Sequence, residues 1–215
     1  MIKVVLFDLD GTLVDSEEVI LRSFDHAFLT CFPEHRLPLL GYRKYMGPIL
    51  KDTFSIYTSD QTLIDKAIQE FISHYRIIEL DLISLFPNVD KTLKELKNRG
   101  YKIALATNKF LTSATPSLTH LDIYKYFDEL FTFGVIKNPK PDNEVIHKAC
   151  ETFNVSEDEI LMVGDNTVDY DCTKGTKALS ALVTYNSWSE DAIKTTNPTY
   201  ILNDISDLLN ILKGE

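Results

Sequence analysis

The sequence has little cysteine, and nothing in its arrangement indicates a covalent or metal scaffold. Its three cysteines, Cys31, Cys150 and Cys172, are odd in number and far apart, and no Cys-x-x-Cys pair occurs. A disulfide framework and a zinc ribbon are therefore not indicated. The five histidines show no metal-ligand spacing either. These absences predict a reducing, cytoplasmic location.

Long apolar runs and excess positive charge are also missing. No apolar run approaches the ~20 residues of a membrane span, and the N-terminus shows no signal-peptide pattern. The net charge of −10 argues against a general nucleic-acid binder and against anionic membrane surfaces. No Gly-x-x-x-x-Gly-Lys sequence is present, which argues against ATP binding through a phosphate-binding loop of that kind. Neither a membrane nor a nucleic acid is expected as a partner.

What the sequence does contain is an apolar content of 44% in 215 residues, enough for a sizeable core. Short apolar runs alternate with helical patterns over most of the chain. Strands are predicted at 4–7, 101–106, 130–132, 160–163, 178–184 and 200–202. Helices are predicted at about 88–99, 112–121, 143–153, 167–176 and 205–212. Such alternation predicts an α/β fold, with a Rossmann-like, mostly parallel sheet flanked by helices.

One long interval interrupts this alternation. No convincing strand occurs between Val14 and Ile83, although several stretches show apolar residues at helical spacing. An interval of ~70 residues is far too long for a plain connecting loop. We therefore predict a core made of residues 1–14 and 84–215, with an inserted all-helical cap domain at 15–83.

The stretch around which the chain is organised is the run 4–7 with the residues that follow it. Asp8 and Asp10 come directly after this buried strand, and Gly11 marks a turn. The two carboxylates lie at the carboxyl edge of a central strand, where open α/β sheets bind ligands. Adjacent carboxylates repel each other unless a cation intervenes. A hard cation such as Mg²⁺ prefers oxygen ligands and suits this pair.

Three further strand ends carry polar residues that belong on the same edge of the sheet: Thr107-Asn108, Lys140, and Asp165 with Asp169. Each alone is also typical of a turn or of a solvated charge. Together, the strings Asp8-Leu9-Asp10-Gly11-Thr12, Ala106-Thr107-Asn108, Lys140-Pro141-Asp142 and Gly164-Asp165-Asn166-Thr167-Val168-Asp169 resemble the four motifs of the haloacid dehalogenase superfamily. The helical insertion is similar to that of its helical-cap subgroup.

The resemblance implies a Mg²⁺-dependent phosphatase that works through an aspartyl phosphate. Asp8 would be the nucleophile, and Asp10 would protonate the leaving oxygen and then activate water. Lys140 would balance the carboxylates and the developing negative charge. Mg²⁺ would be held by the Asp8 carboxylate, the Asp10 carbonyl oxygen and Asp165, with Asp169 in support. The phosphate would be held by the backbone amides of Leu9 and Asp10 and by the side chains of Thr107, Asn108 and Lys140.

The substrate is less closely defined. The segment Tyr45-Met46-Gly47-Pro48 resembles the cap of relatives that are phosphoglycolate phosphatases or inorganic pyrophosphatases, so Arg43, Lys44 and Gly47 are candidate substrate contacts. A small phosphorylated metabolite is the expected partner, with a phosphoglycolate-like ester as the leading interpretation. Pyrophosphate, a nucleotide, a phosphomutase reaction and a non-catalytic phosphate-binding regulator stay open. The sequence does not indicate an oligomeric state.

Two departures from the family pattern were evident. Asn143 stands where many relatives carry a second proline after the third motif. Gly175-Thr176-Lys177 stands where the helix after the fourth motif usually ends in an Ala-Gly pair. Because a lysine at a left-handed helix stop is strained, we expect Gly175 to end that helix early.

Overall fold

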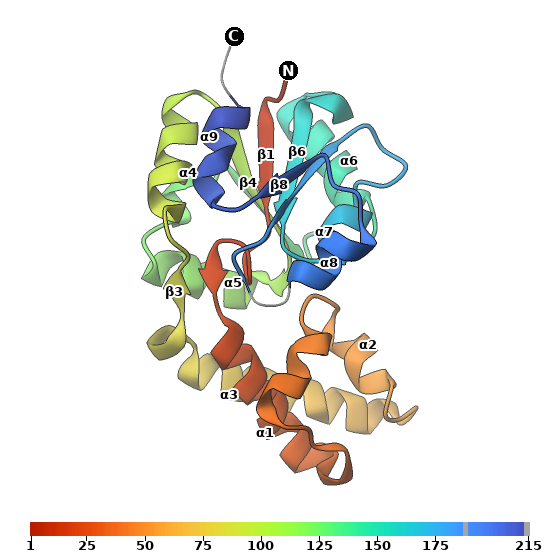
Figure 1. Cartoon of the computed structure of the whole chain (residues 1–215). Coiled ribbons are helices and arrows are strands. Elements are labelled where there is room, and N and C mark those ends of the chain that lie inside the picture. Colours follow the sequence, from red (N-terminus) through yellow and green to blue (C-terminus); the bar gives the residue numbers. More distant parts are fainter. Residues whose placement is uncertain (187–188, 213–215) are drawn as a thin grey trace. The chain divides into compact units, whose positions relative to one another are not determined.

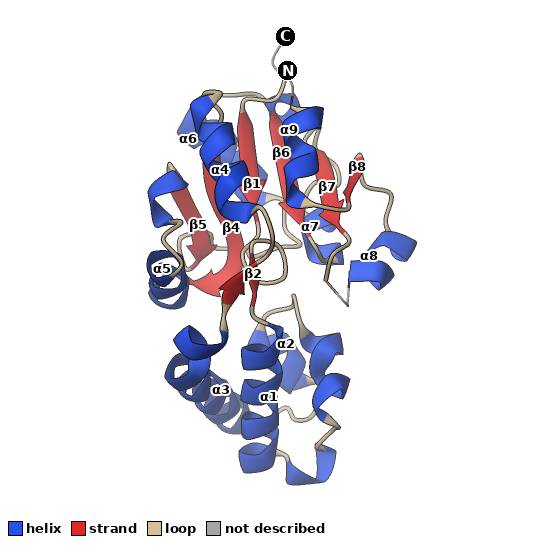
Figure 2. Cartoon of the chain, turned by 60° about the vertical axis from the view of Figure 1, so that its left-hand side comes forward, coloured by secondary structure: helices blue, strands red, loops and turns tan. Residues whose placement is uncertain are grey.

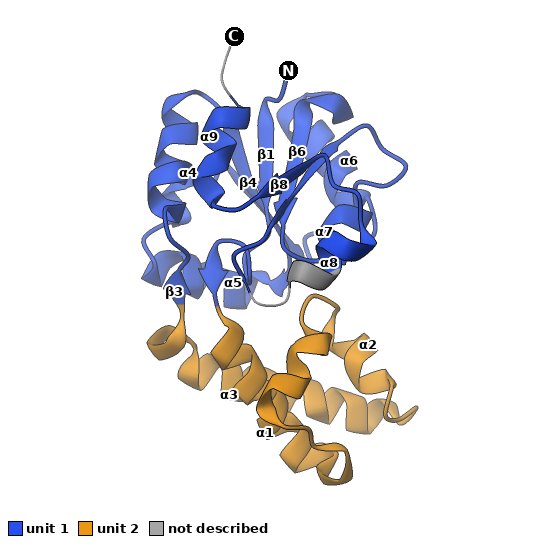
Figure 3. Cartoon of the chain, viewed as in Figure 1, with its two compact units in different colours: residues 1–15, 84–215 blue, residues 16–83 orange. Residues whose placement is uncertain are grey.

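The computed structural model describes residues 1–186 and 189–212, and the chain divides into two compact units. The first, here called the core unit, comprises residues 1–15 and 84–215, and the second, the helical unit, comprises residues 16–83 (Figure 3). The predicted insertion, 15–83, begins one residue earlier. Asp15 belongs to the core unit because it pairs with Ser84 in a short antiparallel ladder.

Within the described residues, six parallel strands form the sheet of the core unit, in the order β5-β4-β1-β6-β7-β8 (Figures 1 and 2). They are β1 (Val4–Phe7), β4 (Lys102–Phe110), β5 (Glu129–Phe133), β6 (Ile160–Gly164), β7 (Leu179–Val183) and β8 (Tyr200–Leu202). All four residues of β1 are fully buried, as expected of a strand covered on both faces. The predicted fold class, a mostly parallel sheet with flanking helices, is confirmed.

Helices cover both faces of this sheet. The helix α6 packs on the face that carries Val4 and Leu6, while α4 and α9 contact each other on the opposite face (Figure 1). The helices of the core unit are α4 (Val89–Asn98), α5 (Leu111–His120), α6 (Glu144–Phe153), α7 (Thr167–Asp171), α8 (Ser189–Thr195) and α9 (Leu208–Ile211). Nowhere in the described chain does a helix combine the length and the apolar character needed to cross a bilayer.

Two element boundaries differ most from the sequence prediction. The strand expected to end at residue 106 continues to Phe110, with a break in register after Thr107, because Phe110 pairs with Phe133 and their rings lie 4.8 Å apart. The helix expected at 167–176 is only five residues long and ends at Asp171. Gly175 does adopt the left-handed backbone expected of it, with φ of +77°, but in the loop beyond the helix.

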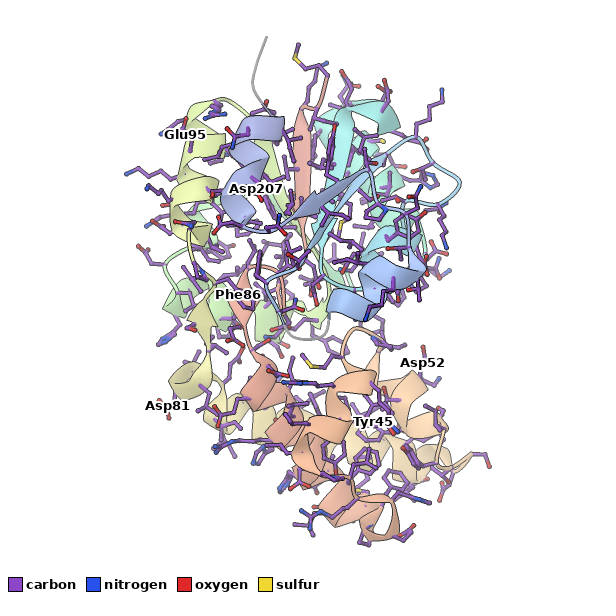
Figure 4. The ribbon with its side chains drawn as sticks, in the orientation of Figure 1. Tyr45, Asp52, Asp81, Phe86, Glu95 and Asp207 are labelled. Carbon is purple, nitrogen blue, oxygen red and sulfur yellow. The ribbon has the colours of Figure 1, made fainter. Side chains whose placement is uncertain are left out.

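The helical unit is built on two long helices that pack together. Its elements are α1 (Glu17–Cys31), α2 (Leu50–Ser55) and α3 (Gln61–Leu82), with short 3₁₀ turns at 33–35 and 39–45. Aromatic rings from α1, α2 and the second turn fill its centre, and the ring of Tyr45 lies among them (Figure 4). Phe24 and Phe28 are fully buried there, with ring centroids 4.7–6.2 Å from their aromatic neighbours. The helical unit therefore has its own hydrophobic core.

The two linkers that lead into and out of the helical unit pair with each other. β2 (Val14–Asp15) and β3 (Ser84–Leu85) form a two-stranded antiparallel ladder. The amide of Phe86 extends it by donating to the carbonyl oxygen of Leu13 at 3.1 Å. Gly11, with φ of +88°, turns the chain out of β1 toward this ladder. Six residues thus separate the end of the central strand from the start of the ladder.

Candidate active site

Parallel pairing brings the predicted site residues of the core unit to one edge of the sheet. Phe7, the last residue of β1, is paired with Leu105 of β4 and with Val163 of β6. The residues that follow these three positions therefore lie together at the carboxyl edge of the sheet. Asp8 follows β1, Thr107 lies in β4, Asp165 follows β6, and Lys140 lies in the loop between β5 and α6.

Lys140 lies between two carboxylates. Its Nζ is 3.0 Å from Oδ1 of Asp8 and 2.5 Å from Oδ1 of Asp169. The Lys140 side chain is only 3% exposed. A lysine is seldom buried without partners of opposite charge, and these two carboxylates supply them. The solvated-charge interpretation of Lys140 is thus excluded, and Lys137, the other lysine of this loop, is exposed.

The charges of this cluster shift one another. Burial raises the pKa of Asp8 to about 6; the Lys140 ammonium opposes this, and the carboxylates of Asp169 and Asp10 add to it. Burial alone would lower the pKa of Lys140, but Asp169 and Asp8 outweigh it and raise that pKa above its ordinary value. Lys140 is therefore an ammonium at any physiological pH, and the charge of Asp8 is poorly compensated.

Three carboxylates of the core unit lie close enough to share a cation. Asp8, Asp165 and Asp169 each offer an oxygen, and these oxygens lie within 4.8 Å of one another. Both Asp169 oxygens are already engaged, since Oδ1 meets Lys140 and Oδ2 accepts from the amides of Asp165 and Asn166 at 3.2 and 3.0 Å. Asp8 and Asp165 are therefore better placed to bind a metal than Asp169. A set of hard carboxylate oxygens fits Mg²⁺.

Gly164 makes room for this arrangement. A Cβ atom at position 164 would lie 2.2 Å from Cγ of Asp169, far inside van der Waals contact. Any side chain there would push the Asp169 carboxylate away from Lys140. The glycine of the Gly-Asp string is thus required by packing at the cluster.

Asp10 lies in the turn that follows β1, apart from the cluster around Lys140. Its side chain is 21% exposed, and its Oδ1 is 3.4 Å from Nζ of Lys109. Between the two aspartates, the side chain of Leu9 is fully buried, and its backbone amide makes a hydrogen bond that lowers the pKa of Asp8. The two aspartates of the first motif therefore have different surroundings, one against Lys140 and one against Lys109.

The end of β4 supplies Thr107 and Asn108. Thr107 is buried, and its Oγ1 accepts a hydrogen bond from the amide of Lys109 at 3.2 Å. Nδ2 of Asn108 donates to the carbonyl oxygen of Lys140 at 2.9 Å. Asn108 thus ties the end of β4 to the loop that carries Lys140.

Four side chains at this edge were not singled out from the sequence. Oγ1 of Thr12 donates to Oδ1 of Asp165 at 2.8 Å, and Lys109 contacts Asp10. Nδ2 of Asn186 donates to the carbonyl oxygen of Gly11 at 2.6 Å, and the Tyr185 hydroxyl donates to the carbonyl oxygen of Thr12. The ring of Tyr185 also contacts that of Phe86, which is labelled in Figure 4, with ring centroids 4.8 Å apart and the ring planes tilted by 52°. Of these four, only Thr12 and Lys109 have a local signal, since Thr12 belongs to the first motif and Lys109 follows the second.

The predicted substrate contacts of the insertion lie in the helical unit. Arg43 forms an ion pair with Glu17, and the Lys44 ammonium lies 4.9 Å from the centre of the Tyr45 ring. Gly47 has φ of +104°, a conformation that favours glycine, and it precedes Pro48. Arg43 and Lys44 are therefore oriented by neighbours within this unit.

Comparison with known proteins identifies the family. A family model for haloacid dehalogenase-like hydrolases matches residues 5–183. A protein of Clostridium perfringens that carries the name PpaX is 34% identical, over 99% of this chain and 98% of its own length. The chain belongs to the haloacid dehalogenase-like hydrolase family.

Other members of this family resemble the chain over nearly its whole length. The pyrophosphatase PpaX of Bacillus cereus is 33% identical over 99% of this chain and 97% of its own. A haloacid dehalogenase-like hydrolase of Streptococcus pneumoniae has a TM-score of 0.84 and 26% identity, covering 99% of both chains. A predicted phosphatase of Clostridium acetobutylicum has a TM-score of 0.86 and 28% identity, covering 99% of this chain and 98% of its own. The protein is thus a haloacid dehalogenase-like hydrolase that resembles these relatives over nearly its whole length.

Proposed function

We propose that this hydrolase is a Mg²⁺-dependent phosphatase that cleaves a small phosphate compound through an aspartyl phosphate on Asp8. The observation that carries the proposal is the position of Lys140, 3.0 Å from the Asp8 carboxylate and buried. A buried ammonium beside a carboxylate at a sheet edge can hold a phosphoryl oxygen in contact with that carboxylate. Phosphoryl transfer depends mainly on such positioning and charge stabilisation.

The reaction would run in two steps. An Asp8 carboxylate oxygen attacks phosphorus, the bond to the leaving oxygen breaks, and Asp10 gives its proton to that oxygen. Asp10 then takes a proton from water, and the resulting hydroxide attacks phosphorus. The bond between phosphorus and the Asp8 oxygen breaks, which regenerates the Asp8 carboxylate and releases inorganic phosphate. During both steps Lys140, the Thr107 hydroxyl and the amides of Leu9 and Asp10 would hold the phosphate oxygens. The net reaction consumes one water.

Mg²⁺ would be held by the carboxylates of Asp8 and Asp165 and by the carbonyl oxygen of Asp10. The cation would offset the charge of the carboxylates and of the phosphate, so that the two can approach each other. Asp169 would orient the backbone after β6 through its two amide hydrogen bonds. Thr12 would orient the Asp165 carboxylate.

Two substrates deserve comparison. Relatives at 31–33% identity are named pyrophosphatases, which favours inorganic pyrophosphate. A small monoester of the phosphoglycolate type is the alternative implied by the Gly47-Pro48 segment. The proposed substrate is a small phosphorylated metabolite in the cytoplasm. A cytoplasmic location agrees with the three free thiols, Cys31, Cys150 and Cys172.

The test is hydrolysis of pyrophosphate, 2-phosphoglycolate and p-nitrophenyl phosphate, each with Mg²⁺ and with excess chelator. We expect phosphate release that needs Mg²⁺. Full activity after thorough chelation would contradict the metal assignment. No release from any phosphate compound in a broad panel would favour a phosphate-binding regulator.

Removal of the Thr12 hydroxyl is expected to weaken Mg²⁺ binding. The variant Thr12→Val keeps the shape of the side chain but takes away the donor to Asp165. Outer partners of metal ligands are typically worth about 10- to 100-fold in metal affinity. We expect the Mg²⁺ concentration for half-maximal activity to rise by that factor, while Thr12→Ser stays close to wild type. Equal Mg²⁺ titrations for both variants would contradict this role of Thr12.

Arg43 is expected to affect substrates selectively. We propose that Arg43 contributes a contact to an anionic leaving group, as the resemblance of the segment Tyr45-Met46-Gly47-Pro48 to the cap of such phosphatases implies. Arg43→Ala should then lower kcat/KM for the anionic natural substrate by about 10-fold, the value of one charge-assisted hydrogen bond. It should barely change kcat/KM for p-nitrophenyl phosphate. Glu17→Gln, which removes the ion-pair partner and keeps Arg43, is the matched control. A loss that is equal for both substrates would rule out this contact.

A further inference from the structure

A second lysine of the core unit lies at the same edge of the sheet as Lys140. The side chain of Lys109 is 10% exposed, and its Nζ lies 3.4 Å from Oδ1 of Asp10 and 3.2 Å from Oγ of Ser117. Lys109 follows Thr107 by two residues at the register break of β4. The amide of Lys109 donates to Oγ1 of Thr107 at 3.2 Å, so Lys109 lies beside Thr107 at the end of β4.

The position of the Lys109 ammonium is fixed by α5. Oγ of Ser117 donates its hydrogen to the carbonyl oxygen of Ser113 at 3.0 Å, and Ser117 is fully buried. With that hydrogen committed, the Ser117 oxygen accepts from Lys109. The ammonium is thereby held 3.4 Å from the Asp10 carboxylate, while Lys140 lies 3.0 and 2.5 Å from the carboxylates of Asp8 and Asp169.

The place of Lys109 relative to Asp10 indicates what it can bind. The leaving oxygen must come within about 2.6–3.2 Å of the Asp10 carboxylate for proton transfer. Lys109 Nζ is 3.4 Å from the same carboxylate, so a group bonded to the leaving oxygen comes within reach of its N–H donors. Lys140, by contrast, contacts Asp8 and Asp169, on the side of the transferred phosphoryl group.

We propose that Lys109 binds the leaving group and makes the site selective for substrates that carry negative charge beside the leaving oxygen, such as the departing phosphate of a diphosphate. This inference rests on the proposed phosphatase function. As the bond to phosphorus breaks, charge moves onto the leaving phosphate, and a fixed ammonium stabilises that charge. Lys109 acts by hydrogen bonding and charge, and it forms no covalent bond.

The experiment compares pyrophosphate with p-nitrophenyl phosphate, whose leaving group has no charged substituent beside the reacting oxygen. Lys109→Met and Lys109→Gln should lower kcat/KM for pyrophosphate roughly 10- to 100-fold, and for p-nitrophenyl phosphate less than about threefold. Lys109→Arg, which keeps the positive charge, should retain most of the wild-type preference for pyrophosphate that the two neutral variants lose. The control is Lys102→Met, at the exposed other end of β4, which removes the same charge without changing either value.

Binding provides a readout that does not need turnover. With Mg²⁺ present, calorimetry should show weaker binding of methylenediphosphonate to Lys109→Met, by a similar factor, and unchanged binding of inorganic phosphate. Equal losses for both ligands, or for both substrates, would show that Lys109 only positions Asp10 and would overturn the proposal, as would no loss at all.

The glutamine variant is expected to disturb the fold less than the methionine variant, because its amide can still donate to Ser117. Circular dichroism and thermal unfolding of both variants test whether they are folded. If the wild-type protein hydrolyses no phosphate compound, the proposed function fails. The binding comparison between the diphosphonate and inorganic phosphate then still decides the role of Lys109.

Discussion

Replacing Asp8 with asparagine is expected to abolish turnover of every phosphate substrate and, at the same time, to stabilise the metal-free protein. The amide oxygen of asparagine is a poor nucleophile, and loss of the nucleophile in a comparable catalytic unit costs more than about 10⁴-fold in kcat. Asparagine keeps the shape of the side chain and an oxygen that can face Lys140. No phosphorylated enzyme should be detectable by mass spectrometry after a rapid acid quench.

The gain in stability follows from the electrostatics of Asp8. Its pKa rises from 3.8 to about 6 on folding, so the folded state disfavours the charged form. At about 1.4 kcal/mol for each pKa unit, the charge destabilises the metal-free protein by about 3 kcal/mol above pH 6. The advantage of Asp8→Asn should be absent below pH 4, grow as the pH rises to 6 and stay constant above it.

The measurement is chemical denaturation in excess chelator at several pH values, with Asp142→Asn as a control. Asp142 lies in the loop that carries Lys140 but is exposed, so its neutralisation changes the net charge equally and should leave both activity and stability nearly unchanged. Residual activity of Asp8→Asn within tenfold of wild type would contradict the assignment of Asp8 as the nucleophile. A loss of stability at pH 7 would show that the contact with Lys140 outweighs the burial of the charge.

Replacing Lys140 with methionine should destabilise the protein, whereas Asp8→Asn should stabilise it. Both variants should lower the activity. The variant leaves Asp8 and Asp169 buried without their shared cation, and removal of one partner from a buried ion pair typically costs about 3–5 kcal/mol. Transfer of the phosphoryl group loses its fixed ammonium, worth about 10²–10³-fold for a single donor. Because this group acts on the chemistry that all substrates share, the activity toward pyrophosphate and toward p-nitrophenyl phosphate should fall by the same factor.

Lys137→Met is the matched control for Lys140, since Lys137 belongs to the same loop and is exposed. A double variant, Asp8→Asn with Lys140→Met, should recover part of the lost stability, because the two side chains are in contact and their effects are not additive. A loss of activity that depends on the leaving group would assign Lys140 the role that we give to Lys109. A stability equal to that of wild type would contradict the buried cluster.

The sheet and the carboxylates of the site were predictable because their signals are local. An apolar run followed by Asp8, or by Gly164-Asp165, places a carboxylate at a strand end wherever the strand lies in the sheet. The order of the strands was not needed, since parallel strands share one carboxyl edge. Lys140 required more, because a lysine in a loop is usually solvated, and only its motif distinguished it from Lys137.

The parts that escaped prediction depend on distant packing. Thr12 meets Asp165 across 153 residues of sequence, and Asn186 meets Gly11 across 175, so no local pattern reports either contact. The extension of β4 to Phe110 depends on its pairing with Phe133, and that extension carries Lys109 to its place beside Asp10. The roles of Arg43, Lys44 and Gly47 stay predictions, because their described contacts lie within the helical unit.

The paired linkers make the helical unit a replaceable module. Val14–Asp15 and Ser84–Leu85 lie side by side as the two arms of a hairpin would, so a two-residue turn of the Asn-Gly type could join them directly. The chain of the core unit would then remain continuous from β1 to α4, with its strand order unchanged. Because the aromatic centre of residues 16–83 is its own, a different insertion can be exchanged at this point without rebuilding the catalytic edge. We propose that the substrate of such an enzyme can in this way change separately from its chemistry.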